Sequence, residues 1–327
     1  MAGNKMNTEA VSSPAVFADD IYSDAPELGP LLDRHSSLLV YTKSNPHFDD
    51  IRTLFNHEIT TTPRAIVRPT NENELTSSVS FCAEHKLPMS VRSGGHDLHG
   101  RSLIQDGVVI DVRALADVRM AREHTPPHAV VGPGVKSGDL LGILDHHGLV
   151  TPVGWCSEVS YAGWAAGGGY GVIAGYYGMG ADQILGARVV TPNGAIVDTD
   201  EDPELLWALR GAGLGNFGVI LELRCRVYPR PRVLAGVLAY PFSEVRSVLG
   251  NFERICAEDL PRAFSGEVAV GDSGFGPAIL IYFHWILDDN YEEGRGYLRK
   301  MGDLGNLVVD TVSESESRSR SAARSYN

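Results

Sequence analysis

A histidine, His96, directly follows a pair of glycines in the segment 91–100, VRSGGHDLHG. The residues before the glycines, Met89–Arg92, look like a short strand, so the glycine pair would turn the chain sharply where that strand ends. Successive backbone N–H groups in such a turn can form a nest for an anion such as a pyrophosphate. His96 would then face whatever the turn binds. The alternative is a surface turn with a solvated histidine, and the local chemistry leaves both interpretations open.

A cysteine, Cys156, stands near the start of a second unusual stretch, 154–171, which is rich in glycine and aromatic residues. A lone cysteine is usually a small buried hydrophobic residue. Glycine costs roughly 0.5–1 kcal/mol relative to alanine inside regular elements. The chain nevertheless has 36 glycines, crowded between Gly94 and Gly218. This density indicates backbone that turns sharply or closely approaches a flat ligand, although any single glycine can simply belong to a loop.

Two segments match nucleotide-binding patterns in letters but not in context. Residues 213–218 fit GxGxxG, but a predicted helix precedes them and a strand follows, the reverse of the order in a dinucleotide-binding fold. Residues 169–174 fit GxGxxA, but no clear strand leads into them and no acidic residue follows at about 20 residues. The sequence has no GxxxxGKS or GxxxxGKT phosphate loop either. These contexts argue against a nicotinamide-dependent dehydrogenase.

The histidines and cysteines lack the spacing of metal ligands. The four cysteines, at positions 82, 156, 225 and 256, are widely separated and form no CxxC pair. His124 and His128 flank two prolines without a third ligand in view, and the pair at 146–147 lies near the end of a predicted helix. We therefore predict neither a metal site nor a disulfide framework.

The chain is acidic and has the composition of a folded protein. Its 327 residues exceed one average domain, 43% of them are hydrophobic, and the formal net charge is −13. An acidic surface repels phosphate backbones and anionic membranes, so we expect neither nucleic acid nor a membrane as a partner. We see no apolar run near ~20 residues and no signal-peptide core. We expect a cytoplasmic location, with secretion left open if the N-terminus is incomplete.

The elements that would position His96 and Cys156 alternate between strand and helix up to about residue 230. A strand at 65–67 is followed by a helix that begins at Asn71 and Glu74 and ends before Pro88. Later elements are a strand at 108–112, a helix from 137 to 148, an Asn-Gly hairpin within 187–198, a helix at 203–209 and a period-two strand at 219–227.

After the PRP sequence at 229–231 the glycines become sparse. Strands at 233–240, 266–270 and 278–285 are predicted there, with a helix at 242–257. The polar run at 313–324, SESESRSRSAAR, is not expected to fold.

In this order the motifs resemble the FAD-linked oxidases of the vanillyl-alcohol-oxidase (PCMH-type) superfamily, and within it the berberine-bridge-enzyme-like branch. The resemblance covers roughly residues 55–231. Its blocks are PRAIVRP at 63–69, RSGGH at 92–96, DGVVIDV at 106–112, GPGV at 132–135, the stretch 156–171, TPNGAIV at 191–197, DPELLWALRG at 202–211 and GNFGVI at 215–220.

The resemblance implies an α+β fold in which a two-subdomain PCMH-type FAD-binding domain precedes a partial antiparallel-sheet substrate domain with helices. We accordingly expect a partly disordered N-terminal extension at 1–54, the FAD domain at 55–231, the partial substrate domain at 232–312 and a low-complexity tail at 313–327.

The resemblance also implies FAD as the cofactor and a set of residues that bind it. His96 matches the histidine bonded to the flavin 8α-methyl group, and Cys156 matches the cysteine bonded to flavin C6. Val159 matches the position that borders the oxygen-access side of the flavin. The remaining matches are Arg92, Ser93, Gly94, Gly95 and Asp97 around the pyrophosphate, Gly132 and Gly134 in a separate block, Gly163, Gly167, Gly168 and Gly171 near the flavin and ribityl chain, and Asn216, Gly218, Val219 and Ile220 at a further FAD contact.

For function the resemblance implies an oxidase that moves hydride from a small-molecule alcohol, amine or related C–H donor to flavin N5, with O₂ as the acceptor. A secondary metabolite is the first choice of substrate and an oligosaccharide the second. Family members continue well beyond position 327 and usually carry the catalytic base there, so we expect a C-terminally truncated chain and assign no base. A catalytically silent flavin-binding or interaction protein is the alternative. The oligomeric state is not predicted.

Overall fold

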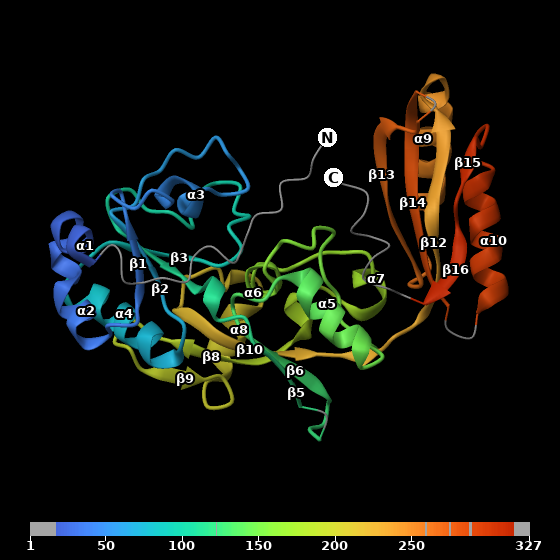
Figure 1. The fold of residues 1–327 in the computed structure, drawn as a ribbon. Coiled ribbons are helices and arrows are strands. Elements are labelled where there is room, and N and C mark those ends of the chain that lie inside the picture. Colours follow the sequence, from blue (N-terminus) through green and yellow to red (C-terminus); the bar gives the residue numbers. More distant parts are fainter. Residues whose placement is uncertain (1–17, 122, 259, 275, 288–289, 317–327) are drawn as a thin grey trace.

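The computed structural model describes residues 18–121, 123–258, 260–274, 276–287 and 290–316. They form three modules built on sheets: a four-stranded sheet near the amino terminus, a five-stranded sheet in the middle of the chain, and another five-stranded sheet after residue 231. Figure 1 shows the first and third modules standing apart at opposite ends of the molecule, with the second module between and below them. The predicted α+β class is confirmed.

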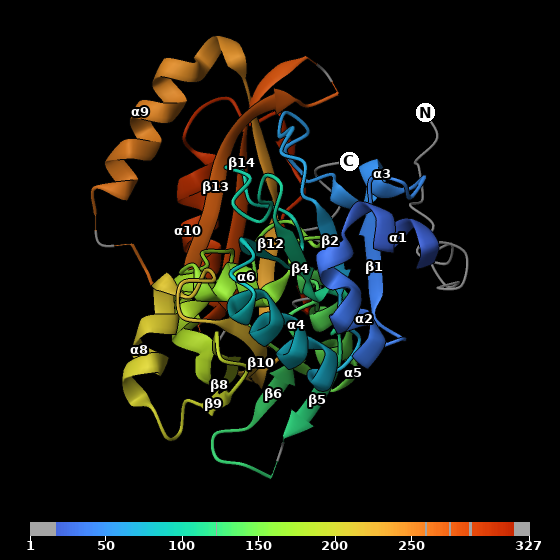
Figure 2. The ribbon, with the colours of Figure 1, turned by 90° about the vertical axis from the view of Figure 1, so that its left-hand side faces the viewer.

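The first module is a sheet in the order β1-β2-β4-β3, in which β2, β4 and β3 are parallel and β1 is antiparallel. Helices α2 and α4 pack on one face and α3 on the other (Figure 2), so β2 and β4 are apolar runs buried on both faces. The elements are α1 (Ala18–Asp24), η2 (Pro26–Leu28), α2 (Gly29–Arg34), β1 (Leu39–Thr42), α3 (Phe48–Arg52), β2 (Ala65–Arg68), α4 (Glu72–Glu84), β3 (Met89–Arg92), β4 (Val108–Asp111) and η3 (Val112–Ala114).

Residues 18–54 of the predicted N-terminal extension are folded, and residues 1–17 lie outside the described residues. Residues 18–54 form α1, η2, α2, β1 and α3, and Leu28 and Leu31 are buried in the core of the first module. Strand β1 completes one edge of the sheet by pairing with β2. The sequence pattern does not reveal these elements because each has only three to seven residues, too few to show a clear period.

The second module is an antiparallel sheet in the order β5-β6-β10-β8-β9. The predicted period-two strand is confirmed, because Leu223 and Cys225 of β10 are fully buried between less buried neighbours. The predicted hairpin is also confirmed, with Gly194 at a φ of +77° between β8 and β9. The elements are β5 (Val118–Ala121), β6 (His128–Val131), α5 (Ser137–His146), β7 (Leu149–Val150), α6 (Tyr161–Ala166), α7 (Ala174–Tyr177), η4 (Ala181–Gln183), β8 (Ile184–Val190), β9 (Ile196–Asp198), α8 (Pro203–Ala212), β10 (Val219–Arg226) and β11 (Tyr228–Pro229).

The third module is an antiparallel sheet in the order β13-β14-β12-β15, with β16 also paired to β12. Alternate residues of β14, such as Phe283 and Trp285, pack in a core with α9 and α10. Tyr282 and His284 therefore lie on the opposite face. The elements are β12 (Arg232–Pro241), η5 (Phe242–Glu244), α9 (Val245–Cys256), β13 (Phe264–Asp272), β14 (Pro277–Leu287), α10 (Tyr291–Gly302), β15 (Val309–Asp310) and β16 (Ser313–Glu316).

Residues 313–316 correct the prediction that the polar run 313–324 does not fold. They form β16, which pairs antiparallel with residues 232–235 of β12. Composition alone underlies the prediction, and it cannot show that a strand edge offers backbone partners to a polar segment. The rest of that run, and the tail to 327, lies outside the described residues. Helix α10 and strand β15 are further elements that the sequence pattern does not predict.

His284 is a buried histidine on the face of the third sheet that carries Tyr282. It is 9% exposed, and its neighbours across the sheet are Ala235 on β12 and Ser265 on β13. Its Nδ1 has no hydrogen-bond partner among the described residues. Burial lowers the pKa of His284 to about 4, so the folded protein holds this ring neutral at pH 7.

We predict that His284 makes the fold sensitive to acid. A histidine in the unfolded chain takes up a proton near pH 6.5, so this contribution to stability is complete above that pH and is lost as the pH falls toward 4. The drop in the free energy of unfolding between pH 7 and pH 5 should be smaller in His284→Gln than in the wild type by about 2 kcal/mol, measured with urea. His99→Gln, at an exposed histidine, should keep the wild-type drop. Equal drops in His284→Gln and the wild type would contradict the assignment.

Candidate functional site

Three loops from distant parts of the sequence meet where the first module joins the second. The loop after β3, residues 92–97, contacts the loop 132–136 through Ser93 Oγ, which donates to the Pro133 carbonyl at 2.5 Å. Main-chain hydrogen bonds of 2.9–3.0 Å then join residues 135–138 to residues 157–161. The structure therefore brings the His96 loop, the GPGV motif and the Cys156 segment together.

Gly94 lies where the His96 loop comes closest to the Cys156 segment. A Cβ at this position would be 2.8 Å from both the N and the Oγ of Ser160, so no side chain fits there. The buried hydroxyls of Ser160 and Ser137 have no hydrogen-bond partner among the described residues. Next to them Gly95 has a φ of +75°, which turns the backbone. Buried hydroxyls without partners beside a turned glycine loop fit a polar group such as the diphosphate of FAD.

His96 is half-buried and held flat against an aromatic ring. Its imidazole stacks on Phe55 with ring centroids 4.8 Å apart, and Phe55 N donates to the Gly95 carbonyl at 2.9 Å. Burial lowers the pKa of His96 most strongly, while the charge of Glu158 raises it and that of Lys136 lowers it. The ring is therefore mainly neutral at pH 7, with a lone pair on one nitrogen.

Cys156 has an exposed, free thiol near the start of the segment 154–171. Glu158, two residues further on, forms an ion pair of 2.6 Å with Lys136 and is also an electrostatic neighbour of His96. Val159 is half-buried, and its N–H donates to the Cys156 carbonyl at 3.3 Å. Its own carbonyl accepts one of the main-chain hydrogen bonds that join residues 135–138 to residues 157–161. The ion pair of Lys136 and Glu158, close in sequence to Cys156, thus lies within electrostatic range of His96.

The glycines predicted to lie near the flavin are required for different reasons. A Cβ at Gly171 would be 1.8 Å from the Val153 carbonyl oxygen, so the protein's own backbone excludes a side chain. Gly168 has a φ of +110°, and a Cβ at Gly167 would be 3.3 Å from Leu214. A Cβ at Gly163 or at Gly168 would meet nothing within 4 Å, so these two glycines leave space that a ligand could fill.

At Gly132 and Gly134, too, the protein's own backbone excludes a side chain. A Cβ at Gly132 would be 2.4 Å from the Leu115 carbonyl oxygen, and one at Gly134 would be 2.5 Å from the Arg113 carbonyl oxygen. Both glycines therefore let the loop 132–136 lie flat on the chain segment that follows β4.

Residues 216–220 run from the end of helix α8 into strand β10 of the second sheet. Asn216 Nδ2 donates to the Ala212 carbonyl at 2.8 Å, and Gly218 has a φ of +136° before β10 begins. Val219 is 3% exposed and Ile220 9%, so their side chains belong to the core and any cofactor contact there is made by the backbone.

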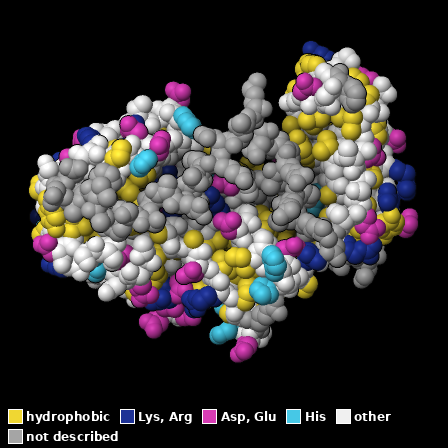
Figure 3. All heavy atoms as spheres, in the orientation of Figure 1, with side chains coloured by type: hydrophobic (Ala, Val, Ile, Leu, Met, Phe, Trp, Pro, Cys, Tyr) yellow, Lys and Arg dark blue, Asp and Glu magenta, His cyan; other side chains and the backbone are white. Residues whose placement is uncertain are grey.

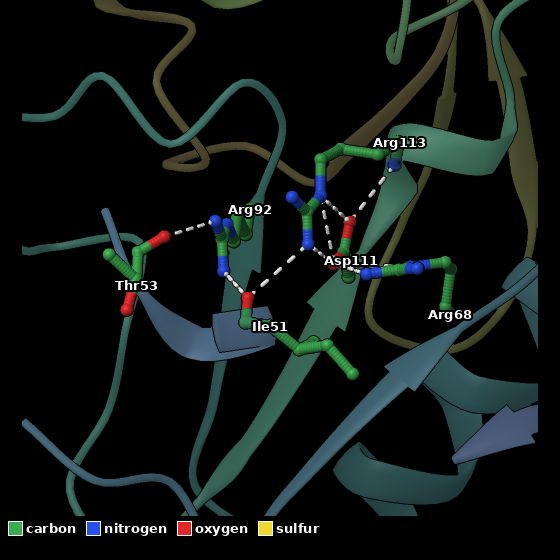
Figure 4. A network of polar contacts seen from close by, with 6 residues as sticks. All are labelled: Ile51, Thr53, Arg68, Arg92, Asp111 and Arg113. Carbon is green, nitrogen blue, oxygen red and sulfur yellow. Dashed lines mark hydrogen bonds and ion pairs between the residues drawn. The ribbon is translucent and has the colours of Figure 1, made fainter. Parts of the chain in front are cut away.

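Arg92 and Asp97 stabilise the loop that carries His96 from within the protein. The Arg92 side chain is 2% exposed and donates to the carbonyls of Ile51 and, at 2.6 Å, Thr53 (Figure 4). The Asp97 carboxylate accepts hydrogen bonds of 3.1 Å from the backbone N–H groups of His99 and Ser102. These side chains hold the loop in shape, which leaves its backbone to contact a ligand.

The third sheet reaches the site through a ring contact that sequence reasoning does not find. The rings of Trp155 and Tyr282 lie edge to face with centroids 6.1 Å apart. Two further contacts dock the sheet on the second module: Ser265 Oγ donates to the Val172 carbonyl, and Arg262 Nε donates to the Tyr176 carbonyl at 2.8 Å. Figure 3 shows hydrophobic side chains on the side of the third module that faces the first module.

The part of the chain that the structure describes contains no group of three or more His, Cys, Asp or Glu residues placed to hold a metal ion. None of its helices is long and apolar enough to cross a membrane.

Comparison with known proteins matches this architecture. The model of a family described as FAD binding domain matches residues 63–200. The FAD-linked oxidoreductase aurO of Gibberella zeae is 37% identical over 288 residues, which cover 88% of this chain and 56% of that protein. The chain thus spans little more than half the length of that curated relative.

Two solved structures share the fold. That of 6-hydroxy-D-nicotine oxidase from Arthrobacter nicotinovorans has a TM-score of 0.78 and 28% identity, over 86% of this chain and 62% of the other. That of the Physcomitrella patens BBE-like 1 protein has a TM-score of 0.76 and 22% identity, over 88% and 62% of the two chains, a likeness of fold alone.

The family match and the shared fold define an FAD-binding domain of the PCMH type, which the third sheet follows. The chain belongs to the family of this FAD-binding domain, and its relatives include FAD-linked oxidoreductases and a tetrahydroberberine oxidase of Berberis wilsoniae, 34% identical over 68% of this chain and 43% of that protein.

We predict that Gly94→Ala separates the loops of the site. Its Cβ would force the His96 loop away from Ser160, at a cost of about 1–3 kcal/mol in the free energy of unfolding. Less FAD should remain bound after gel filtration, measured by flavin absorbance. Gly142→Ala in α5 is the matched control, because its Cβ meets nothing within 4 Å, and it should be neutral or stabilising by up to about 1 kcal/mol. Equal behaviour of the two variants would show that the contact at Ser160 is unimportant.

Proposed function

We propose that the chain is the FAD-binding and partial substrate-binding part of an FAD-dependent oxidase. The convergence of His96 and Cys156 on one site is the observation that supports this most. Bound FAD would supply the hydride acceptor, flavin N5, and reaction of the reduced cofactor with O₂ would yield hydrogen peroxide. The protein's part is to bind the cofactor, orient the substrate and limit access of water.

We further propose that His96 and Cys156 hold the flavin covalently, as a two-anchor site. A neutral imidazole has the free lone pair that a bond to carbon requires, and the lowered pKa keeps His96 in that form. Stacking on Phe55 fixes the plane of the ring. The exposed thiol of Cys156 is open to a second bond from another loop. Two anchors on separate loops would fix the flavin ring in position and in rotation.

Denaturation separates a bonded flavin from one that is only bound. We expect the wild-type chain to keep its flavin in acid or detergent, detected by intact mass and gel fluorescence. His96→Ala and Cys156→Ala should each keep one bond, and the double variant should release all of its flavin on denaturation. Cys256→Ala, at another exposed cysteine, should behave as the wild type. Folded wild-type protein that releases its flavin would refute covalent attachment and leave noncovalent FAD binding intact.

We propose that the substrate lies between the flavin and the face of the third sheet that carries Tyr282. Trp155 precedes the proposed anchor Cys156, so its contact with Tyr282 joins the cofactor segment to that face. Aromatic rings favour a flat, partly apolar small molecule that carries an alcohol or amine, which is our first choice. Glu267 on β13 pairs across the sheet with Tyr282 and is exposed, and a carboxylate there would suit the hydroxyls of an oligosaccharide, the second choice.

Release of hydrogen peroxide tests the activity. Incubation with panels of alcohols, amines and oligosaccharides should yield peroxide with one class, and the active class decides between the two substrate choices. Tyr282→Ala should raise KM for that substrate by about tenfold, the loss of roughly one aromatic contact. Val270→Ala, an exposed side chain of the same sheet, is the control and should leave KM unchanged. A chain that binds FAD but releases no peroxide with any panel would instead be a catalytically silent flavin-binding protein.

A further inference from the structure

A cluster of charged residues lies at the carboxyl ends of the three parallel strands of the first module. Arg68, Arg92 and Asp111 are the last residues of β2, β3 and β4, and Arg92 and Asp111 are direct partners across the sheet. Arg113 follows in the turn after β4. Ligands of open α/β sheets bind outside this edge of the strands. Figure 4 shows the four side chains converging there, together with the carbonyl groups of Ile51 and Thr53.

Asp111 is the only carboxylate in this cluster, and it is fully buried. It accepts hydrogen bonds from Arg113 Nη2 at 2.6 Å and from Arg68 Nη2 at 2.9 Å. Burial opposes its ionisation, but the hydrogen bond from Arg113 and the charges of the three arginines hold the pKa of Asp111 below its ordinary value. The carboxylate is therefore ionised, as a buried charge with partners can be.

Because of Arg92, the cluster carries an excess of positive charge. Its guanidinium donates only to backbone carbonyls, and its Nε has no hydrogen-bond partner among the described residues. Burial lowers the pKa of Arg92 to about 10, so it stays charged at pH 7. The charged groups that act on it are Arg113, Asp111 and Arg68. Three guanidinium groups thus face one carboxylate, and a buried excess of charge is costly unless something balances it.

The cluster lies directly beneath two loops of the cofactor site. A Cβ at Gly95 would be 3.1 Å from both Nε and Nη2 of Arg92, so the glycine turn rests on this guanidinium. A Cβ at Gly134 would be 2.5 Å from the Arg113 carbonyl oxygen, so the GPGV loop rests on the same segment. The positive excess and the backbone that would bind the diphosphate are therefore in contact.

We propose that the cluster of Arg68, Arg92, Asp111 and Arg113 balances the negative charge of the FAD diphosphate and so makes the site select a diphosphate-bearing flavin. The selection acts through the protein, because Arg68 and Arg113 direct their guanidinium groups at Asp111 and Arg92 lies under the loop. They are positioning and charge-balancing residues rather than groups that bind the phosphates directly. The inference rests on FAD binding at this site and not on the oxidase activity.

The charges of the cluster allow a test in which two substitutions should change the preference for FAD over riboflavin in opposite directions. The full chain carrying His96→Ala and Cys156→Ala exchanges flavin freely, and it is titrated with FAD and with riboflavin, which lacks phosphate. Added Arg113→Gln removes a positive charge and should weaken FAD binding by about tenfold, the value of one charge-assisted interaction, and riboflavin binding less than about twofold. Added Asp111→Asn removes the negative charge and should raise the preference for FAD over riboflavin, even though it lowers the melting temperature.

A cluster that only supports the fold gives a different result. Both substitutions would then weaken FAD and riboflavin in parallel, and that outcome, or a fall in the FAD preference with Asp111→Asn, would overturn the proposal. If Arg113→Gln does not fold, Arg68→Gln and Arg113→Lys replace it: the first should reduce the FAD preference and the second, which keeps the charge, should not. Arg119→Gln, in an exposed ion pair with Glu222, is the control with no expected effect. Failure of both ligands to bind would reject the cofactor site itself, whereas absent peroxide release would leave this result untouched.

Discussion

The main-chain hydrogen bonds between residues 135–138 and 157–161 are the joint on which the rest of the site depends. Buried backbone donors and acceptors must be paired, and here each loop supplies the partners of the other. Lys136 and Glu158 belong to the two paired segments, and their side chains form an ion pair between them. The His96 loop then docks against this joint through Ser93 and the bare backbone of Gly94. The positions of His96 and Cys156 therefore follow from backbone pairing, which is more rigid than contact between long side chains.

The segment that holds Cys156 also connects the cofactor site to the third sheet. Trp155 lies one residue before the proposed flavin anchor, and its ring meets Tyr282. The sheet is docked by Ser265 and Arg262, which donate to carbonyls near α7, in the second module. One face of β14 thus packs against α9 and α10, while the other face carries Tyr282, which contacts Trp155. Period-two alternation along a single strand is what separates these two roles.

The sequence predicts the parallel strands, the hairpin and the period-two strand correctly, because each has a strong local pattern. The family motifs also predict which residues bind the cofactor, and that part stays a prediction; they do not predict how these side chains are held in the fold. The guanidinium of Arg92 turns to the carbonyls of Ile51 and Thr53, in a segment whose short elements have no visible period. The contact between Trp155 and Tyr282 joins two modules, and no local pattern encodes it. Pairing of β16 depends likewise on an edge formed elsewhere in the chain.

The crowded glycines have a consequence for what a sequence motif reports. At Gly132, Gly134 and Gly171 an added Cβ would strike carbonyl oxygens of the protein itself. Mutation at these positions is therefore opposed by the folding of the apoprotein, whatever chemistry takes place above it. A descendant that had lost its substrate, or even its turnover, would still be under selection to keep them. Such a motif is a marker of ancestry and architecture, and catalytic competence has to be inferred from other residues.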